Sequence, residues 1–406
     1  MLLRSHGMYL LTCLVIASIF LYWRQVSGWH SSGLHFSPRN SANSTLGFGA
    51  IYAISAHNSP RRDDLLQAAN VTGLNVQIPR IPAWTQEQVD EFRDFDHLEE
   101  STILDGSIKA WLSHAVALRT FLSSGKETAL FLEDDVDWDI RLRTLQVPLT
   151  AAAQRSILPR APKRYYWGNP ADWDLLYLGH CGDYFTTVDT MHVGVGVVHP
   201  SDLEEIPHAL YQDPTLPDPS DMHPFTVALL TAFNLPPKTR MVHQSRWPLC
   251  TFGYAVTRSM AAQILDEIAP PVEVPNRHTH AYDIAILEAC RDKGYRCFTV
   301  NPELFHHMEG TSLIDGAVRN KAARPPADRV GMTQVRYRNE TSNIGCGFWS
   351  KDFHWDGDME RLAFLKEEVG RKGRCLKPGR KDDGSRMMPI EPTARRNIHR
   401  HGHRPS

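Results

Sequence analysis

The strongest constraint on the fold is a run of apolar residues at 128–132 (TALFL) that ends directly at three acids. A strand with one face in solvent alternates apolar and polar residues, whereas this run is apolar along most of its length. Such runs are typical of strands in a parallel sheet that helices cover on both faces. Residues 50–54 (AIYAI) and 174–178 (DLLYL) have the same character. The sequence therefore predicts a sheet that is buried on both sides.

Helical patterns separate these runs. After Asp105, apolar residues recur at helical spacing as far as Val116, and Gly125 offers a stop. Strands alternating with helices indicate a mostly parallel α/β sheet. We expect further helices after Arg61 and at 258–268 and 282–292, and further strands at 193–198, 252–256 and 297–300.

Proline interrupts this pattern between residues 200 and 248. This stretch holds nine of the 27 prolines of the chain. It predicts an insertion of long irregular loops with one helical patch near 227–233.

The N-terminus resembles a membrane anchor. Residues 7–23 carry no charge and lie between Arg4 and Arg24, and their length suits a short membrane-spanning helix. An uncleaved signal anchor is favoured over a cleaved signal peptide, which would give a secreted protein. We expect a single-pass type II protein of the Golgi or endoplasmic reticulum: anchor at 1–23, flexible stem at 24–46, lumenal domain at 47–350 and an extension at 351–406. The tail from residue 377 has eight basic and three acidic residues and is expected to be disordered.

Composition and short motifs agree with a lumenal globular domain. The chain of 406 residues is 42% hydrophobic with a formal net charge of -2, which excludes a disordered or polytopic membrane protein and gives no reason to expect a nucleic-acid partner. Glycosylation sequons begin at Asn43, Asn70 and Asn339. Six cysteines follow the anchor and either form three disulfides or stay as free thiols, which spacing alone leaves open: Cys181, Cys250, Cys290, Cys297, Cys346 and Cys375.

The three acids after the apolar run are the clearest chemical signal. Glu133, Asp134 and Asp135 stand at the carboxyl end of the predicted strand, which is where open α/β sheets bind ligands. With Asp137 and Asp139 close behind, the carboxylates would repel one another unless a cation neutralised them. Oxygen ligands favour Mn²⁺ or Mg²⁺, and such an ion also binds substrate phosphates. The alternative is a solvated acidic turn.

The same region resembles a known enzyme family. Residues 104–137 are similar to the hallmark segment of glycosyltransferase family 25, which includes galactosyltransferases of lipopolysaccharide biosynthesis and of procollagen. Gly106, Leu112-Ser113-His114 and Glu133-Asp134-Asp135 match. Residues 173–179, 251–265 and 302–312 resemble later blocks. The chain departs from the pattern at Thr257, Met260 and His306 or His307.

The resemblance implies a GT-A-like fold: a twisted, mostly parallel sheet flanked by helices, here with the Pro-rich insertion. It also implies inverting transfer of a hexose, with galactose as the expected sugar, from a UDP-sugar to a glycan, lipid or protein acceptor. The metal would be Mn²⁺ or Mg²⁺.

Site roles follow from the resemblance. Asp283 is the expected general base. The metal ligands would be Glu133, Asp135 and His306, with His307 as the alternative histidine. The expected donor-binding residues are Ile54, Ser55, Arg61, Arg62, Ser113, His114, Glu133 and Asp134.

Two other functions stay open. A non-catalytic lumenal relative that binds glycans through a degenerate site would tolerate the departures, although the intact acidic triplet argues against it. A metal-dependent phosphoesterase would use the same carboxylates without an acceptor.

Overall fold

The computed structural model describes residues 41–93, 101–159, 165–185, 199–274, 279–308, 340–378 and 380. The predicted anchor, the strand at 193–198, most of the stem and of the basic tail, and the sequon at Asn339 lie outside these ranges. Within them, no helix is both long enough and apolar enough to span a bilayer.

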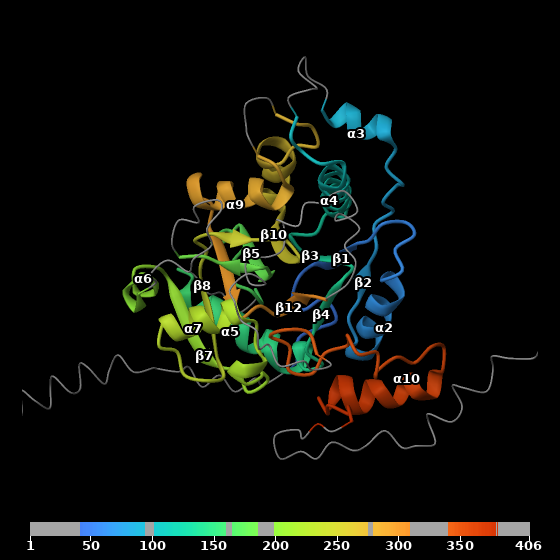
Figure 1. Cartoon of the computed structure of the whole chain (residues 1–406), viewed down its shortest axis with the longest axis vertical. Coiled ribbons are helices and arrows are strands. Elements are labelled where there is room, and N and C mark those ends of the chain that lie inside the picture. Colours follow the sequence, from blue (N-terminus) through green and yellow to red (C-terminus); the bar gives the residue numbers. More distant parts are fainter. Residues whose placement is uncertain are drawn as a thin grey trace, which may run out of the picture.

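An eight-stranded sheet forms the centre of the molecule, in the order β2-β1-β3-β10-β5-β11-β8-β7 (Figure 1). Strands β8 and β10 run opposite to the others, so the expected mostly parallel α/β sheet is confirmed. Its strands are β1 (Ala50–Ile54), β2 (Val76–Gln77), β3 (Thr128–Glu133), β5 (Leu175–Gly179), β7 (His208–Gln212), β8 (Thr239–Gln244), β10 (Gly253–Thr257) and β11 (Cys297–Asn301). Two short antiparallel pairs join β4 (Val136–Trp138) to β12 (Phe305–His307), and β6 (Gly182–Asp183) to β9 (Pro248–Leu249).

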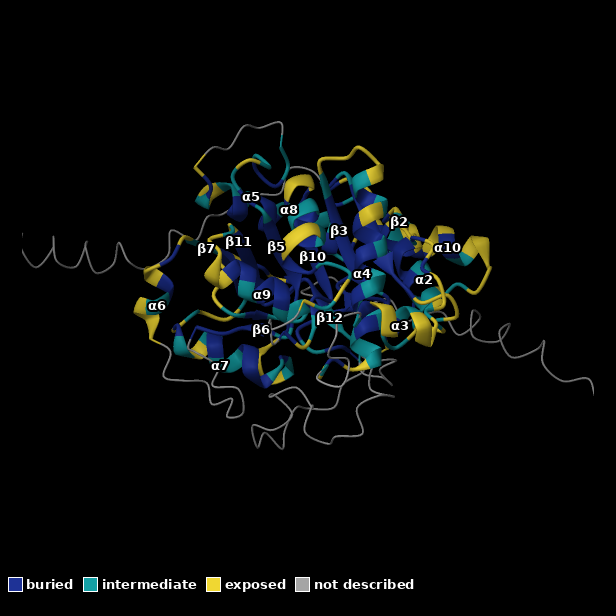
Figure 2. Cartoon of the chain, turned by 90° about the horizontal axis from the view of Figure 1, so that it is seen from above, coloured by how far each residue is buried: buried dark blue, intermediate teal, exposed yellow. Residues whose placement is uncertain are grey.

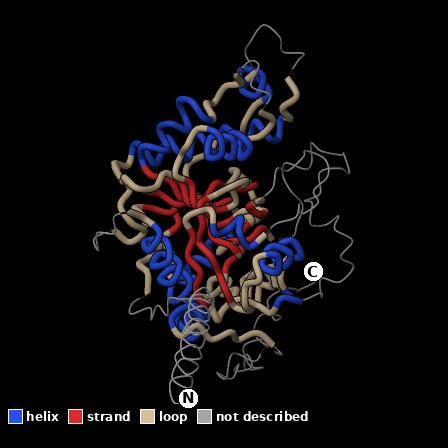
Figure 3. Tube along the Cα trace, turned by 90° about the vertical axis from the view of Figure 1, so that its left-hand side faces the viewer, coloured by secondary structure: helices blue, strands red, loops and turns tan. Residues whose placement is uncertain are grey.

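Helices cover both faces of this sheet, as the apolar runs require (Figure 3). Along β3, Ala129 and Phe131 face one core while Leu130 and Leu132 face the other, because successive side chains point to opposite sides of a strand. The strands are buried and the exposed residues lie on the outer helices and loops (Figure 2). One face is covered by α3 (Gln86–Phe92), α4 (Asp105–Ser123), α8 (Arg258–Gln263) and α9 (Tyr282–Asp292), and the other by α2 (Arg62–Thr72), α5 (Val147–Ile157) and α10 (Met359–Leu365).

The expectation of irregular loops between residues 200 and 248 is wrong. This stretch contains β7 and β8, which extend the sheet, together with α6 (Pro200–Glu204) and α7 (Pro224–Ala232). Except for Pro248 in the short strand β9, the prolines lie in the connections or at the starts of helices, where a missing N–H costs little, and neither β7 nor β8 contains one. The high proline content therefore indicated the turns correctly but led to the wrong prediction for the strands between them.

A buried ion pair fixes these two strands to the rest of the sheet. Arg240 on β8 donates from Nε to Asp213 Oδ2 at 2.8 Å, and both side chains are at most 1% exposed. The same guanidinium donates from Nη1 to the carbonyl of Glu303 at 2.8 Å and to that of Pro302. Arg240 thus links β8 to the chain that leads into β12.

The folded domain extends beyond the predicted boundaries at both ends. Near its start, Ala42 donates its N–H to Arg143, and the Leu46 carbonyl accepts from the Trp167 indole. Near its end, α10 and the π-helical turn Lys366–Arg371 pack on α2, where Gly370 comes so close to the Val71 carbonyl that a Cβ would clash. The six cysteines form three disulfides: Cys181–Cys250, Cys290–Cys297 and Cys346–Cys375.

The Arg240–Asp213 pair gives a test of this architecture. Arg240→Met leaves a buried carboxylate without its counter-charge, so we expect the free energy of unfolding to fall by about 3–5 kcal/mol. The double variant Asp213→Asn/Arg240→Met should recover part of the loss, because no buried charge remains. Urea denaturation measures both. A single variant as stable as the parent chain would contradict the role of the pair.

Candidate functional site

The three acids lie where the chain leaves β3 for β4. Strands β1 and β3 are parallel neighbours with Ile54 opposite Glu133, so both end at the same edge of the sheet. The Glu133 N–H donates to the Phe252 carbonyl at 2.8 Å, which ties the end of β3 to the start of β10. Asp134 and Asp135 follow in the turn and are only 4% and 6% exposed. The carboxylates are therefore held in a buried, fixed turn and not in a solvated loop.

Arg61 supplies the first positive charge. It precedes α2, at the same sheet edge, and its guanidinium bridges the two aspartates: Nε lies 3.1 Å from Asp134 Oδ1, and Nη1 lies 2.5 Å from Asp135 Oδ2. Its side chain keeps 24% exposure. Of the residues expected at the donor, Arg61 contacts both Asp134 and Asp135.

His307 contacts the same carboxylate oxygen of Asp135 as Arg61. Strand β12 pairs antiparallel with β4, and the Met308 N–H donates to the Asp135 carbonyl at 2.7 Å. This places His307 Nε2 3.1 Å from Asp135 Oδ2. His306 pairs with Glu303 instead, since neighbouring residues of a strand point to opposite sides. Of the two histidines considered as ligands, the one near Asp135 is His307.

The charges of these groups act on one another strongly. Burial acts against ionisation of Asp135, but the hydrogen bond and charge of His307 and the charge of Arg61 hold its pKa below the ordinary value. Burial of Glu133, reinforced by the charge of Asp135, raises the pKa of that carboxyl to about 8. Asp135 is thus stabilised as an anion, whereas Glu133 favours its protonated form.

The acids can contribute ligands to a cation without forming a complete cage. Across the described ranges, no group of three or more His, Cys, Asp or Glu side chains is gathered to hold a metal ion. However, Asp134 Oδ2 and Asp135 Oδ1 are buried without a hydrogen-bond partner among the described atoms. Mg²⁺-type sites in nucleotide-binding proteins use one or two carboxylates and complete their shell with water and phosphate. These two oxygens fit that arrangement.

Asp137 and Asp139, which add to the acidic cluster in the sequence, have structural partners of their own. Asp137 is buried and accepts from Phe348 N at 2.7 Å and Thr341 Oγ1 at 2.7 Å. Asp139 accepts from Arg141 Nε at 2.8 Å and Cys346 N at 2.9 Å. Their oxygens accept these hydrogen bonds, so both carboxylates bind the C-terminal chain, although burial still raises the pKa of Asp137.

His114 lies behind the acids inside the protein. Its Nε2 is 3.9 Å from Glu133 Oε1, and its Nδ1 is 3.0 Å from the Tyr254 hydroxyl, which is 2.8 Å from the Tyr282 hydroxyl. Burial lowers the pKa of His114 to about 3, so its imidazole is neutral. Ser113 accepts from the Trp84 indole at 2.9 Å and donates to the Lys109 carbonyl at 2.6 Å. His114 thus contacts the site from within α4, whereas Ser113 links α4 to Trp84.

The other residues expected at the donor shape the end of β1. Arg62 donates to Ser55 Oγ at 3.2 Å and to the Ala56 carbonyl at 2.7 Å. Ile54 is buried beside them, opposite Glu133. These contacts fix the loop between β1 and α2, which contains Arg61.

Asp283, the expected base, begins α9. Its Oδ2 accepts from the Cys250 N–H at 3.1 Å, and Cys250 belongs to the disulfide with Cys181. Burial raises the pKa of Asp283, and its charge contributes to the raised pKa of Glu133. Asp283 is therefore close enough to the acidic triplet to interact with it electrostatically, and it also anchors the start of its helix.

Sequence reasoning missed Glu303, Tyr254 and Tyr282 as parts of this region. Tyr254 and Tyr282 stand within segments that resemble the family, but nothing in their spacing shows that their hydroxyls meet. Because His306 and His307 are consecutive residues of a strand, their side chains must point to opposite faces, which is a signal that the sequence does contain.

Comparison of this chain with models of protein families and with curated proteins found no match.

The buried hydroxyls behind Glu133 give a graded test. Tyr254→Phe removes contacts with both His114 and Tyr282, so we expect a loss of about 1–3 kcal/mol in unfolding free energy, while Tyr282→Phe should lose about 0.5–1.5 kcal/mol. The Tyr177 hydroxyl is buried without a described partner, and Tyr177→Phe should be neutral or stabilising. Urea denaturation of the three variants measures this order. Equal losses in all three would contradict the network.

Proposed function

We propose that this protein is a metal-dependent glycosyltransferase that takes a hexose from a nucleotide-diphosphate sugar. The observation that carries the proposal is the turn after β3, where Asp134 and Asp135 each keep a buried carboxylate oxygen without a partner while Arg61 lies against both. Carboxylates for a cation and a guanidinium for phosphate oxygens are the two groups that binding of a diphosphate requires.

The residues around the turn suit such a reaction. When bound, Mn²⁺ or Mg²⁺ would offset the charge that develops on the leaving diphosphate. Asp134 and Asp135 would hold it, and His307 would orient Asp135. Arg61 is partly exposed and offers its charge to phosphate oxygens. Asp283, with its raised pKa, would accept the proton of the acceptor hydroxyl.

The resemblance to glycosyltransferase family 25 supports the finer assignment. It favours UDP-galactose as donor, inversion at the anomeric carbon, and a glycan, lipid or protein acceptor. A lumenal site in the Golgi or endoplasmic reticulum is supported by the three disulfides, because disulfides form and persist mainly in oxidising compartments.

The alternative is a non-catalytic relative that binds glycans in the same place. The buried and compensated aspartates favour the enzyme, since burying two carboxylates without a function carries a desolvation cost. Binding of UDP that does not depend on Mn²⁺ would favour the alternative.

Asp135→Asn tests the proposal directly. We expect Mn²⁺-dependent transfer from UDP-galactose to fall at least about a hundredfold, because the anion that would bind the cation is lost. Asp63→Asn is the matched control: this exposed acid stands in the first turn of α2, and its variant should keep the parent activity. Release of UDP with and without acceptor is the measurement. Unchanged turnover in Asp135→Asn would refute the assignment, and hydrolysis without acceptor would favour a phosphoesterase.

Arg61→Met distinguishes the effect of Arg61 on cation binding from its effect on phosphate binding. Removing the guanidinium leaves Asp134 and Asp135 less compensated, so we expect Mn²⁺ alone to bind several-fold more tightly. UDP in the presence of Mn²⁺ should bind about tenfold more weakly, because a charge-assisted contact is lost. Isothermal titration with Mn²⁺ and then with UDP measures both effects. A variant that weakened both, or neither, would contradict this role for Arg61.

A further inference from the structure

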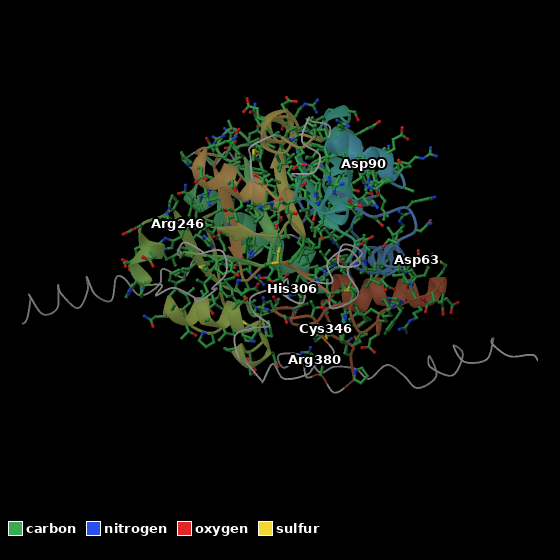
Figure 4. All side chains as sticks on the ribbon, turned by 45° about the horizontal axis from the view of Figure 1, so that its top comes forward. Asp63, Asp90, Arg246, His306, Cys346 and Arg380 are labelled. Carbon is green, nitrogen blue, oxygen red and sulfur yellow. A yellow bond between two sulfur atoms is a disulfide. The ribbon has the colours of Figure 1, made fainter. Side chains whose placement is uncertain are left out.

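The C-terminal segment (residues 340–378) lies outside the region that resembles the family, yet it contacts three elements that surround the site. These elements are β4, β12 and α2, and the last residues of the segment return to Glu340 at its start. In Figure 4, Cys346 of this segment lies just below His306 of β12, near the middle of the molecule. Each of these contacts involves buried or partly buried polar groups with defined partners.

The contact with β4 is the deepest. Asp137 accepts from the backbone N–H groups of Phe348 and Trp349 at 2.7 and 3.3 Å, and from Thr341 Oγ1 at 2.7 Å. Gly347 packs directly against the same carboxylate, where a Cβ would clash with Asp137. The segment is therefore fitted onto the strand that directly follows Asp134 and Asp135.

The contact with β12 passes through Asn343. Its Nδ2 donates to Glu303 Oε1 at 2.8 Å and to Thr226 Oγ1 on α7 at 2.9 Å. Glu303 Oε1 also binds His306 Nδ1. Asn343 thus secures the side of β12 opposite His307.

The third contact is with α2, the helix that directly follows Arg61. Gln67 Oε1 accepts from the Trp355 N–H at 2.8 Å, and Gln67 Nε2 donates to Asp356 Oδ1 at 3.0 Å. Asp64 forms an ion pair with Lys351 at 2.8 Å, and His354 Nε2 lies 3.3 Å from Asp64 Oδ1. The segment therefore contacts both the helix that follows Arg61 and the strand that carries His307.

Covalent and ionic contacts close the segment on itself. The Cys346–Cys375 disulfide joins its two arms. Glu340 is 2% exposed at its side chain and pairs with Lys377 at 2.9 Å and Arg380 at 2.7 Å. The two ends of the segment are therefore joined to each other as well as to the elements that it contacts.

We propose that the C-terminal segment is a brace that holds Arg61 and His307 against Asp135, with Asn343 as a positioning residue. Asn343 fixes Glu303 and His306, so the next side chain along β12, His307, points to Asp135. The consequence for donor binding rests on the proposed function, whereas the positioning of β12 does not.

Hydrogen–deuterium exchange of the full chain tests the positioning. In Asn343→Ala, amides of residues 303–308 should exchange at least about tenfold faster, because the contact that secures this side of β12 is lost. Thr226→Val is the matched control: it removes the hydrogen bond from Asn343 to Thr226 but leaves the bonds to Glu303 and to the His223 N–H, so exchange of β12 should stay at the parent rate. Unchanged exchange in Asn343→Ala, or an equal rise in Thr226→Val, would overturn the proposal.

If Asn343→Ala does not fold, a second variant tests the contact between the C-terminal segment and α2. Gln67→Ala removes the contacts with Trp355 and Asp356, so amides at the first turn of α2 should exchange several-fold faster while β12 stays protected. No change at α2 would overturn the brace.

Donor affinity separates this inference from the proposed function. If the parent chain binds UDP with Mn²⁺, Asn343→Ala should weaken that binding about tenfold and Thr226→Val should not. A parent chain that does not bind UDP refutes the proposed function and leaves the exchange result to decide on the brace.

Discussion

The compensation of Asp135 by Arg61 and His307 is the interaction on which the rest of the site depends. A buried carboxylate is costly unless opposite charges or hydrogen bonds offset its desolvation. Here the two cations come from chain segments far apart in sequence, one preceding α2 and one on β12, and both meet a turn that directly follows β3. Parallel β1 and β3 end at the same edge, which is the reason that the first cation can reach the acid.

This dependence explains why so many polar contacts serve the site indirectly. His114, Tyr254 and Tyr282 support Glu133 from one core of the sheet. On the other side, Glu303 fixes His306, and thereby β12. The alternation of side chains along a strand turns one histidine toward Asp135 and the other toward Glu303. Asp135 thus contacts residues that follow β1 and residues of β12, and β12 is linked through Glu303 to the C-terminal segment.

Local patterns predicted much of the fold. The apolar runs at β1, β3 and β5 and the helices α4 and α9 follow from spacing that acts within one element. Strands β7 and β8 could not be predicted in this way, because their burial depends on Arg240 and Asp213, two charged residues that meet only in the folded chain. The carboxylates of the site were visible in the sequence, but their partners were only partly so. Asp137 shows the limit most clearly: in the sequence it adds charge beside the acidic triplet, and only the distant Thr341 and Phe348 reveal its structural role.

The central claim is that Asp134 and Asp135 bind a cation together with a nucleotide diphosphate. Anomalous diffraction from crystals grown with Mn²⁺ and UDP tests it most directly. We predict one manganese peak within coordination distance of a carboxylate oxygen of Asp134 or Asp135, in contact with a UDP phosphate, with Arg61 on a phosphate oxygen. UDP bound with no manganese at these carboxylates, or manganese bound only elsewhere, would contradict it.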